Sequence, residues 1–126
     1  MTIPTEVIFR HMDHSSALEE KIHQRVDKLQ RFSDDIIQCR VSVEEPHKHH
    51  QRGNLFQVCL DVSVPGNEFV VKRAPEKHKE YEDAWVAVRD AFNKMERQLA
   101  AWHQRQRVKS HVRVLNEEMP MIDSIN

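Results

Sequence analysis

Apolar and polar residues alternate in four short segments of the chain, and a period of two is typical of half-buried strands. The segments cover residues 3–11, 37–44, 55–64 and 68–73. The residues expected on the buried side of the two middle segments are Ile37, Cys39, Val41, Val43, Phe56, Val58, Leu60, Val62 and Val64. Pro65-Gly66-Asn67 is a tight-turn signal before the last segment, so the last three strands are expected to form an antiparallel meander.

Two further segments have helical spacing. Ser15 and Ser16 precede Glu19 in a capping-box pattern, and apolar residues then recur every three or four positions up to a predicted helix end near Phe32. A longer apolar stripe predicts a second helix from about Lys79 to Arg107, about 40 Å long. This stripe consists of Tyr81, Trp85, Val88, Phe92, Met95, Leu99 and Trp102. Because a six-residue strand spans only about 20 Å, the end of this helix, with Trp102, should project past the sheet.

The predicted elements follow one another in the order β-α-β-β-β-α, which indicates an α+β fold. We expect a two-layer sandwich in which both helices, including the long C-terminal one, pack on one face of a four-stranded sheet. Residues 1–107 would form this single domain. Residues 108–126 show no clear period and contain Pro120, so they are expected to form a flexible C-terminal tail.

The composition excludes several classes of protein. Gly53 and Gly66 are the only glycines, so the chain has no glycine-rich loop for a nucleotide phosphate. Cys39 and Cys59 are too few for a disulfide framework, and strand parity puts them on opposite faces of the sheet. No apolar run is long enough for a membrane span, and the N-terminus carries no secretion signal. We expect a reduced, cytoplasmic protein without a membrane contact.

Candidate catalytic chemistry is sparse. The chain has neither a G-x-S-x-G nor an H-E-x-x-H motif, and its paired acids lie at the ends of predicted elements, where carboxylates cap helices or contact water. Nucleophilic catalysis by Cys59 would need a base that the spacing does not provide. We therefore expect no enzyme activity, no cofactor and no small-molecule substrate.

A histidine-rich segment, EEPHKHHQRG, links the second and third predicted strands. Imidazoles at short spacing can share a metal ion, but no cysteine or second cluster completes a tetrahedral set, so no metal site is expected. A solvated polar loop is one interpretation. The other is an adaptable cationic loop that makes an accessory contact with RNA phosphate through His47, Lys48, His49, His50 and Arg52.

Basic residues gather on both predicted helices, although the net charge is only -1. On the first helix Lys21, Arg25 and Lys28 share one strip. The C-terminal half of the second helix is basic through Arg89, Lys94, Arg97, Arg105 and Arg107. Such strips are often solvated surface. A basic helix end that projects past the sheet is not needed to cover it, however, and favours RNA binding by local charge.

The order of elements and two local motifs resemble those of a known family. The first helix reads SSALEEKIHQRVDKLQRF, and the second carries DAWVAV at 83–88 followed by KMERQL at 94–99. Over residues 3–107 this pattern resembles the ribosome hibernation promoting factor and RaiA family of bacterial ribosome-associated translation inhibitors. The residues after Arg107 are too few for the second domain of the long family members, so short-form behaviour is expected.

The resemblance implies binding to the small ribosomal subunit, in the channel for mRNA and tRNA, and inhibition of translation under stress or in stationary phase. It also implies that basic residues of both helices face 16S rRNA and that the factor is a monomer off the ribosome. The residues that match the late motif are Lys94, Arg97 and Gln98, with Arg105 and Arg107 just beyond it. Lys21, Arg25 and Lys28 match in charge only.

The chain also departs from the family pattern. Ala100-Ala101-Trp102 stands where family members are usually lysine-rich, and Arg89 stands where an acid is common. Two other classes of function stay open. One is a general RNA-binding or RNA-chaperone module, since small domains of this kind can grip RNA by shape and phosphate. The other is a protein-interaction module that uses the free face of the sheet.

Overall fold

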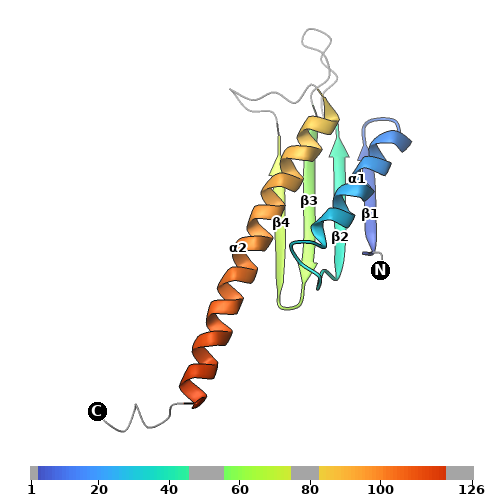
Figure 1. The fold of residues 1–126 in the computed structure, drawn as a ribbon. Coiled ribbons are helices and arrows are strands. Elements are labelled where there is room, and N and C mark those ends of the chain that lie inside the picture. Colours follow the sequence, from blue (N-terminus) through green and yellow to red (C-terminus); the bar gives the residue numbers. More distant parts are fainter. Residues whose placement is uncertain (1–2, 46–55, 75–82, 119–126) are drawn as a thin grey trace.

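Six elements form the described part of the chain, which in this computed structural model comprises residues 3–45, 56–74 and 83–118. They follow the predicted order β-α-β-β-β-α (Figure 1). Their bounds are β1 Thr5–Arg10, α1 Ser16–Leu29, β2 Gln38–Glu44, β3 Gln57–Val64, β4 Asn67–Arg73 and α2 Ala84–Glu118. The fold is α+β, as the sequence predicts.

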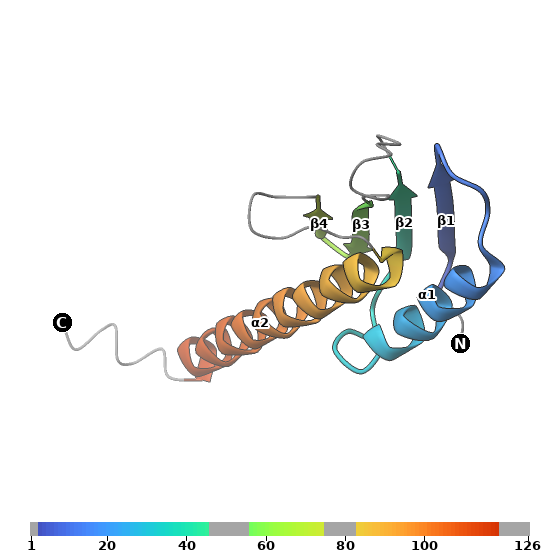
Figure 2. The same cartoon turned by 90° about the horizontal axis from the view of Figure 1, so that it is seen from above.

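The four strands form one mixed sheet in the order β1-β2-β3-β4. Strands β1 and β2 are parallel because α1 crosses over between them, whereas β2, β3 and β4 form the predicted antiparallel meander. The turn between β3 and β4 contains Gly66 at a φ of 83°, a left-handed conformation that favours glycine. Seen from above, both helices lie on the same face of the sheet (Figure 2). The predicted two-layer arrangement is confirmed.

The core lies between the sheet and the two helices. Val41, Leu60 and Val71 are aligned across β2, β3 and β4, and all three are buried. The helix residues that cover the strands are Leu18, Ile22, Val26 and Leu29 from α1, and Val88, Phe92, Met95 and Leu99 from α2. The prediction that Ile37 faces this core is wrong. Ile37 precedes β2, where strand parity no longer fixes the direction of a side chain, and it is 53% exposed.

Helix α1 is capped one residue earlier than a box from Ser16 to Glu19 would require. The Ser15 hydroxyl oxygen accepts a hydrogen bond from the Leu18 N–H at 3.2 Å, so Ser15 is the N-cap. The helix ends at Leu29, shortly before the predicted end near residue 32. Both differences are shifts of a boundary, and the buried stripe of the helix is as predicted.

Helix α2 starts and ends later than predicted. It begins at Ala84 rather than Lys79, because the Asp83 carboxylate accepts a hydrogen bond from the Trp85 N–H at 2.9 Å and caps the first turn. It then continues through Glu118. A helix of 35 residues is about 52 Å long, almost twice the roughly 27 Å of the eight-residue β3.

The predicted boundary between a domain of residues 1–107 and a flexible tail of residues 108–126 does not coincide with the end of this helix. Residues 108–118 are helical, and residues 119–126 lie outside the described part of the chain. The sequence of 108–118 contains no glycine or proline, and the next proline is Pro120. No residue of this segment therefore has a backbone chemistry that would end the helix.

Trp102 and His103 are the last residues of α2 that the body of the protein holds firmly. The Trp102 ring packs edge-on against Phe69 of β4, with ring centroids 5.8 Å apart. His103 Nε2 lies 2.8 Å from the Ser33 hydroxyl oxygen. The prediction that Trp102 projects past the sheet is therefore wrong. We name residues 104–118 of α2 the overhang, and Figure 1 shows this end of α2 extending beyond the sheet.

Candidate nucleic-acid interface

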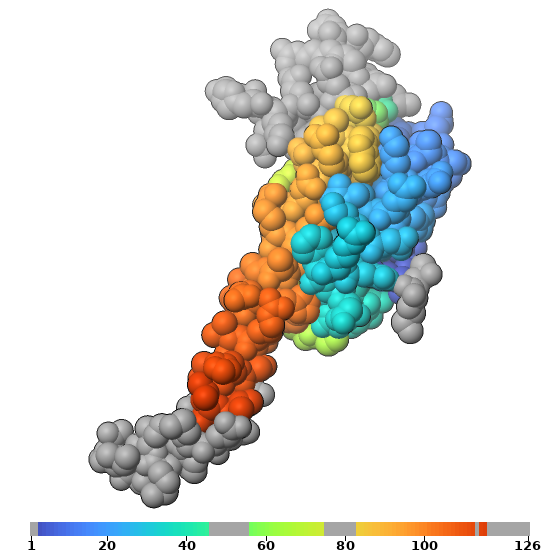
Figure 3. Space-filling model, viewed as in Figure 1, coloured from blue at the N-terminus to red at the C-terminus, as the bar shows by residue number. Residues whose placement is uncertain are grey.

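The overhang and the turns of α2 just before it form a basic segment. No Asp or Glu occurs in the sequence between Glu96 and Glu117. The Arg and Lys residues of this stretch are Arg97, Arg105, Arg107, Lys109 and Arg113. All of them except Arg113, whose side chain is not described, lie at exposed positions. Figure 3 shows this end of α2 as a rod that projects from the body, so its positive charge is accessible to a ligand.

The cations surround the overhang instead of forming one strip. An α-helix turns by about 100° per residue, so Arg105 and Arg107 point about 160° apart. Lys94, Gln98 and Arg105 share a side, because they are spaced by four and seven residues. The Arg107 guanidinium donates a hydrogen bond to the Gln104 side-chain oxygen at 2.8 Å. A ligand that contacts all these residues must enclose the helix, as a groove or channel does.

Arg25, one of the basic residues predicted on α1, is engaged within the protein. Its guanidinium lies 2.8 Å from a Glu96 carboxylate oxygen and donates to the Asn93 side-chain oxygen at the same distance. It also lies over the Phe92 ring, 5.6 Å from the ring centroid. Only 13% of the Arg25 side chain and 10% of the Glu96 side chain are exposed. The ion pair links α1 to α2, and little of the Arg25 side chain remains accessible to RNA.

Lys21 and Lys28 lie at exposed positions of α1. The Lys21 ammonium nitrogen is 5.2 Å from the centroid of the Trp85 ring, a cation–π contact that holds its charge beside the first turn of α2. Lys28 follows Lys21 by seven residues, or about two turns, and therefore lies on the same side of α1. Two of the three predicted α1 cations are thus presented at the surface.

A polar pocket lies between the end of α1 and the base of the overhang. The described residues that line it are Gln30, Arg31, Phe32, Ser33, Asp34, His103 and Arg107. Two of these residues, Arg31 and His103, were not predicted from the sequence. Arg31 follows Lys28 by three residues, so helical spacing could have found it. His103 offered no such signal, because its hydrogen-bond partner Ser33 is 70 residues away along the chain.

The histidine-rich loop lies outside the described residues. This applies to the predicted accessory RNA contacts His47, Lys48, His49, His50 and Arg52. Within the described ranges, no three His, Cys, Asp or Glu side chains come close enough together to hold a metal ion. None of the helices in those ranges is long and apolar enough to cross a membrane. The described part of the candidate interface consists of basic residues on α1 and α2 and of Arg31 just after α1.

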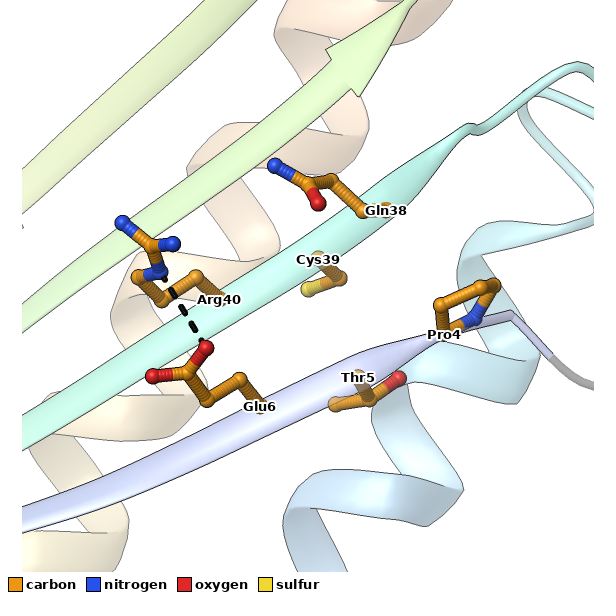
Figure 4. Close-up of a pocket in the computed structure, with 6 residues that line it drawn as sticks. All are labelled: Pro4, Thr5, Glu6, Gln38, Cys39 and Arg40. Atoms are coloured by element: carbon orange, nitrogen blue, oxygen red, sulfur yellow. Dashed lines mark ion pairs between the residues drawn. The ribbon is translucent and has the colours of Figure 1, made fainter.

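The open face of the sheet carries charges of both signs. Glu6 and Arg40 point toward each other across β1 and β2, with 3.7 Å between the carboxylate oxygen and the guanidinium nitrogen (Figure 4). The hollow beside them reaches Cys39. Burial, reinforced by the charge of Asp61, raises the pKa of the Cys39 thiol to about 12, so it stays protonated at neutral pH and is a poor nucleophile. Cys59 is half-buried, with the opposite strand parity, as predicted.

Two solved structures share this fold. One is the N-terminal domain of Protein Y from Thermus thermophilus, with a TM-score of 0.62 and 18% sequence identity. The other is a ribosomal subunit interface protein from Coxiella burnetii, with a TM-score of 0.65 and 20% identity. Each similarity covers 81% of this chain and 99% of the other chain. No match was found among curated proteins.

The family comparison covers most of the chain. Residues 5–107 match the model of the family described as sigma 54 modulation protein / S30EA ribosomal protein. The match includes α1, the whole sheet and α2 as far as Arg107, so it ends within the overhang. The resemblance seen in the sequence is thereby confirmed, and the chain belongs to the sigma 54 modulation protein / S30EA ribosomal protein family.

Proposed function

We propose that this protein binds the small ribosomal subunit and inhibits translation under stress or in stationary phase. The observation that carries the proposal is the basic segment of α2, which has no acidic residue between Glu96 and Glu117 and projects from the body. Family membership supports a ribosomal role, and one structure of the same fold is named a ribosomal subunit interface protein. The role is one of binding, without catalysis, and it is exercised in the cytoplasm.

The overhang is the part that we place in the channel for mRNA and tRNA, against 16S rRNA. Because its cations point in several directions, they can contact phosphates on more than one wall of a channel. Lys21 and Lys28 on α1, together with Arg31 at the base of the overhang, extend the basic surface along the helical face. Each cation that neutralises a phosphate releases counterions, so binding weakens as the salt concentration rises.

Co-sedimentation with purified small subunits tests this proposal. Changing Arg105→Glu and Arg107→Glu together should remove the protein from the subunit fraction and relieve inhibition in a cell-free translation assay. The matched control changes Arg40→Glu and Lys72→Glu, two exposed cations on the open face of the sheet, and therefore alters the net charge equally. This control should co-sediment as the unmodified protein does. Replacing the three loop histidines, His47, His49 and His50, by Ala should have a smaller effect than the overhang reversal.

Thermal melting and a salt titration complete the test. The overhang variant should melt like the unmodified protein, because exposed substitutions usually change stability by less than about 0.5 kcal/mol. The control loses the exposed Arg40–Glu6 ion pair and places a carboxylate opposite Asp61, so it should melt slightly lower. An overhang variant that still co-sediments would move the contact to α1 or to the sheet. Equal affinity for unrelated structured RNA would favour the general RNA-binding module instead. An unmodified protein that never co-sediments would refute the proposed function.

A further inference from the structure

The polar pocket between the end of α1 and the base of the overhang has a lining that contact with phosphates alone does not explain. Its volume is about 240 Å³. Sites that enclose a whole drug-sized ligand measure roughly 300–1,000 Å³, so this pocket is of a size to take one planar ring or one phosphate. Figure 3 shows the turn after α1 beside this part of α2. The pocket therefore adjoins the surface that we place against RNA.

A network of side chains holds one side of the polar pocket in place. The hydroxyl of the buried Ser33 donates a hydrogen bond to the Asp35 carboxylate. His103 Nε2 lies 2.8 Å from the Ser33 hydroxyl oxygen and 3.4 Å from a carboxylate oxygen of Asp35. The His103 ring also packs edge-on against Trp102, with ring centroids 4.9 Å apart. These contacts fix the His103 ring before a ligand binds and engage the charge of Asp35 within the protein.

Asp34 differs from its neighbour Asp35, because no side chain in the described ranges forms an ion pair with it. It lies at an exposed position and lines the polar pocket together with Arg31 and Arg107. A carboxylate repels a phosphate, so Asp34 disfavours a site for phosphate alone. Two guanidinium groups and a carboxylate together suit a ligand that offers both hydrogen-bond acceptors and hydrogen-bond donors.

We propose that the polar pocket binds one unstacked guanine of the RNA that the overhang contacts, an inference that rests on the proposed function. Guanine presents O6 and N7 as acceptors for the guanidinium groups of Arg31 and Arg107. Its N1–H and its amino group lie side by side and match the two carboxylate oxygens of Asp34. Phe32 and His103 add aromatic rings to the lining, and unpaired RNA bases stack on such rings.

Guanine matches this set of groups better than the other RNA bases do. Adenine and cytosine carry an amino group without a ring N–H beside it, and uracil carries a ring N–H without an amino group. Each of these bases therefore presents a single donor group to the Asp34 carboxylate, where guanine presents two. The phosphates on either side of the bound guanine stay with the exposed cations of the overhang. The polar pocket thus adds a base preference to a surface that otherwise contacts phosphates.

Fluorescence anisotropy with short single-stranded RNAs and the full chain tests the proposal. The probes are labelled heptamers of adenosine, with and without one central guanosine. The unmodified protein should bind the guanosine-containing heptamer at least about fivefold more tightly, the discrimination expected of one good bidentate contact to a base. Replacing the guanosine by inosine removes the amino group that faces Asp34, so the preference should shrink. Equal affinity for all three RNAs, or no binding to any of them, overturns the proposal.

A pair of variants tests the role of Asp34. Asp34→Asn keeps the shape of the side chain but replaces one acceptor by a donor, so it should abolish the guanosine preference without weakening binding of the adenosine heptamer. The matched control, Asp27→Asn, removes an exposed carboxylate of α1 outside the pocket and should keep both the preference and the effect of inosine. If both variants tighten binding of all the RNAs alike, Asp34 acts through its charge alone and the proposal is wrong.

The outcomes are separable from those that test the proposed function. A protein that co-sediments with small subunits but binds the three heptamers equally keeps the ribosomal role and overturns the guanine pocket. A protein that prefers the guanosine-containing heptamer but never co-sediments keeps the pocket and loses the ribosomal role. Asp34→Asn changes an exposed residue of a turn and should melt like the unmodified protein, so its loss of preference reports on the pocket and not on unfolding.

Discussion

The two halves of α2 belong to one continuous helix but differ in what their side chains contact. In the half before the overhang, Phe92, Met95 and Leu99 are fully enclosed between the sheet and α1. In the overhang no described side chain is buried, and Val108, Val112 and Leu115 are exposed to solvent. One half of this helix therefore stabilises the fold, and the other half presents charged and apolar side chains to solvent. Substitutions in the two halves should therefore have separable effects.

Truncation of Phe92 should give the largest loss of stability. Its side chain is completely buried, so Phe92→Ala removes that burial and leaves a cavity, at a cost of about 3–5 kcal/mol in the free energy of unfolding. Val108→Ala in the overhang should change the same quantity by less than about 0.5 kcal/mol. Urea denaturation at low protein concentration measures both values. Similar losses at the two positions would show that the overhang packs against the body in solution.

Breaking the Arg25–Glu96 pair should cost less, about 3 kcal/mol. Glu96→Ala leaves the Arg25 guanidinium without its carboxylate at a site where only 13% of its side chain is exposed. Replacing both residues together, Arg25→Met with Glu96→Leu, should recover much of the loss, because no unpaired charge is then enclosed. A double-mutant cycle from urea denaturation measures this coupling. Strictly additive losses would mean that the two side chains act independently.

The Cys39 thiol should make the stability of the body decrease at alkaline pH. Burial raises its pKa from 9.0 to about 12 on folding. Well below pH 9.0 the thiol is protonated in both the folded and the unfolded state, so its ionisation does not lower the free energy of unfolding. As the pH rises from there toward 12, the unfolded chain loses the proton while the folded chain keeps it. The free energy of unfolding therefore falls, by up to about 1.4 kcal/mol per pH unit.

Comparison of urea denaturation at about pH 8 and about pH 10 isolates this effect, because Cys39→Ala should remove the thiol's share of the pH dependence. Cys59→Ala is the matched control, since it removes a thiol that is only half-buried. The same pH dependence in the unmodified protein and in Cys39→Ala would indicate that water reaches the Cys39 sulfur.

Periodicity predicted the core well and the element boundaries less well. A buried stripe repeats along its own element, so Leu18, Ile22 and the residues that follow them could be assigned from spacing alone. Boundaries depend on single interactions, such as the hydrogen bond from the Trp85 N–H to the Asp83 carboxylate. The end of α2 was not predicted because the apolar residues change sides of the helix between Trp102 and Val108. The stripe stops there, although the backbone continues as a helix.

For the candidate interface, the sequence indicated which residues are basic but not which of them are engaged elsewhere. Arg25 shares a helical strip with Lys21 and Lys28, and nothing local distinguishes it from them. Its partner Glu96 is 71 residues away along the chain, so the ion pair exists only once α1 and α2 pack together. For Arg31 the opposite holds. Its helical spacing from Lys28 can be seen in the sequence, but its position beside Arg107 arises only from the packing of α1 against α2.

Helix α2 is fixed to the body at Trp102 and His103, so a small change of angle there displaces its far end. From His103 to Glu118 the helix extends about 22 Å, so a tilt of about 10° at the base would displace the far end by about 4 Å. The contact of Trp102 with Phe69 and that of His103 with Ser33 limit such a tilt. A small loosening of the turn that holds Ser33 is therefore magnified along the helix. It would misplace distant cations without altering a single charge.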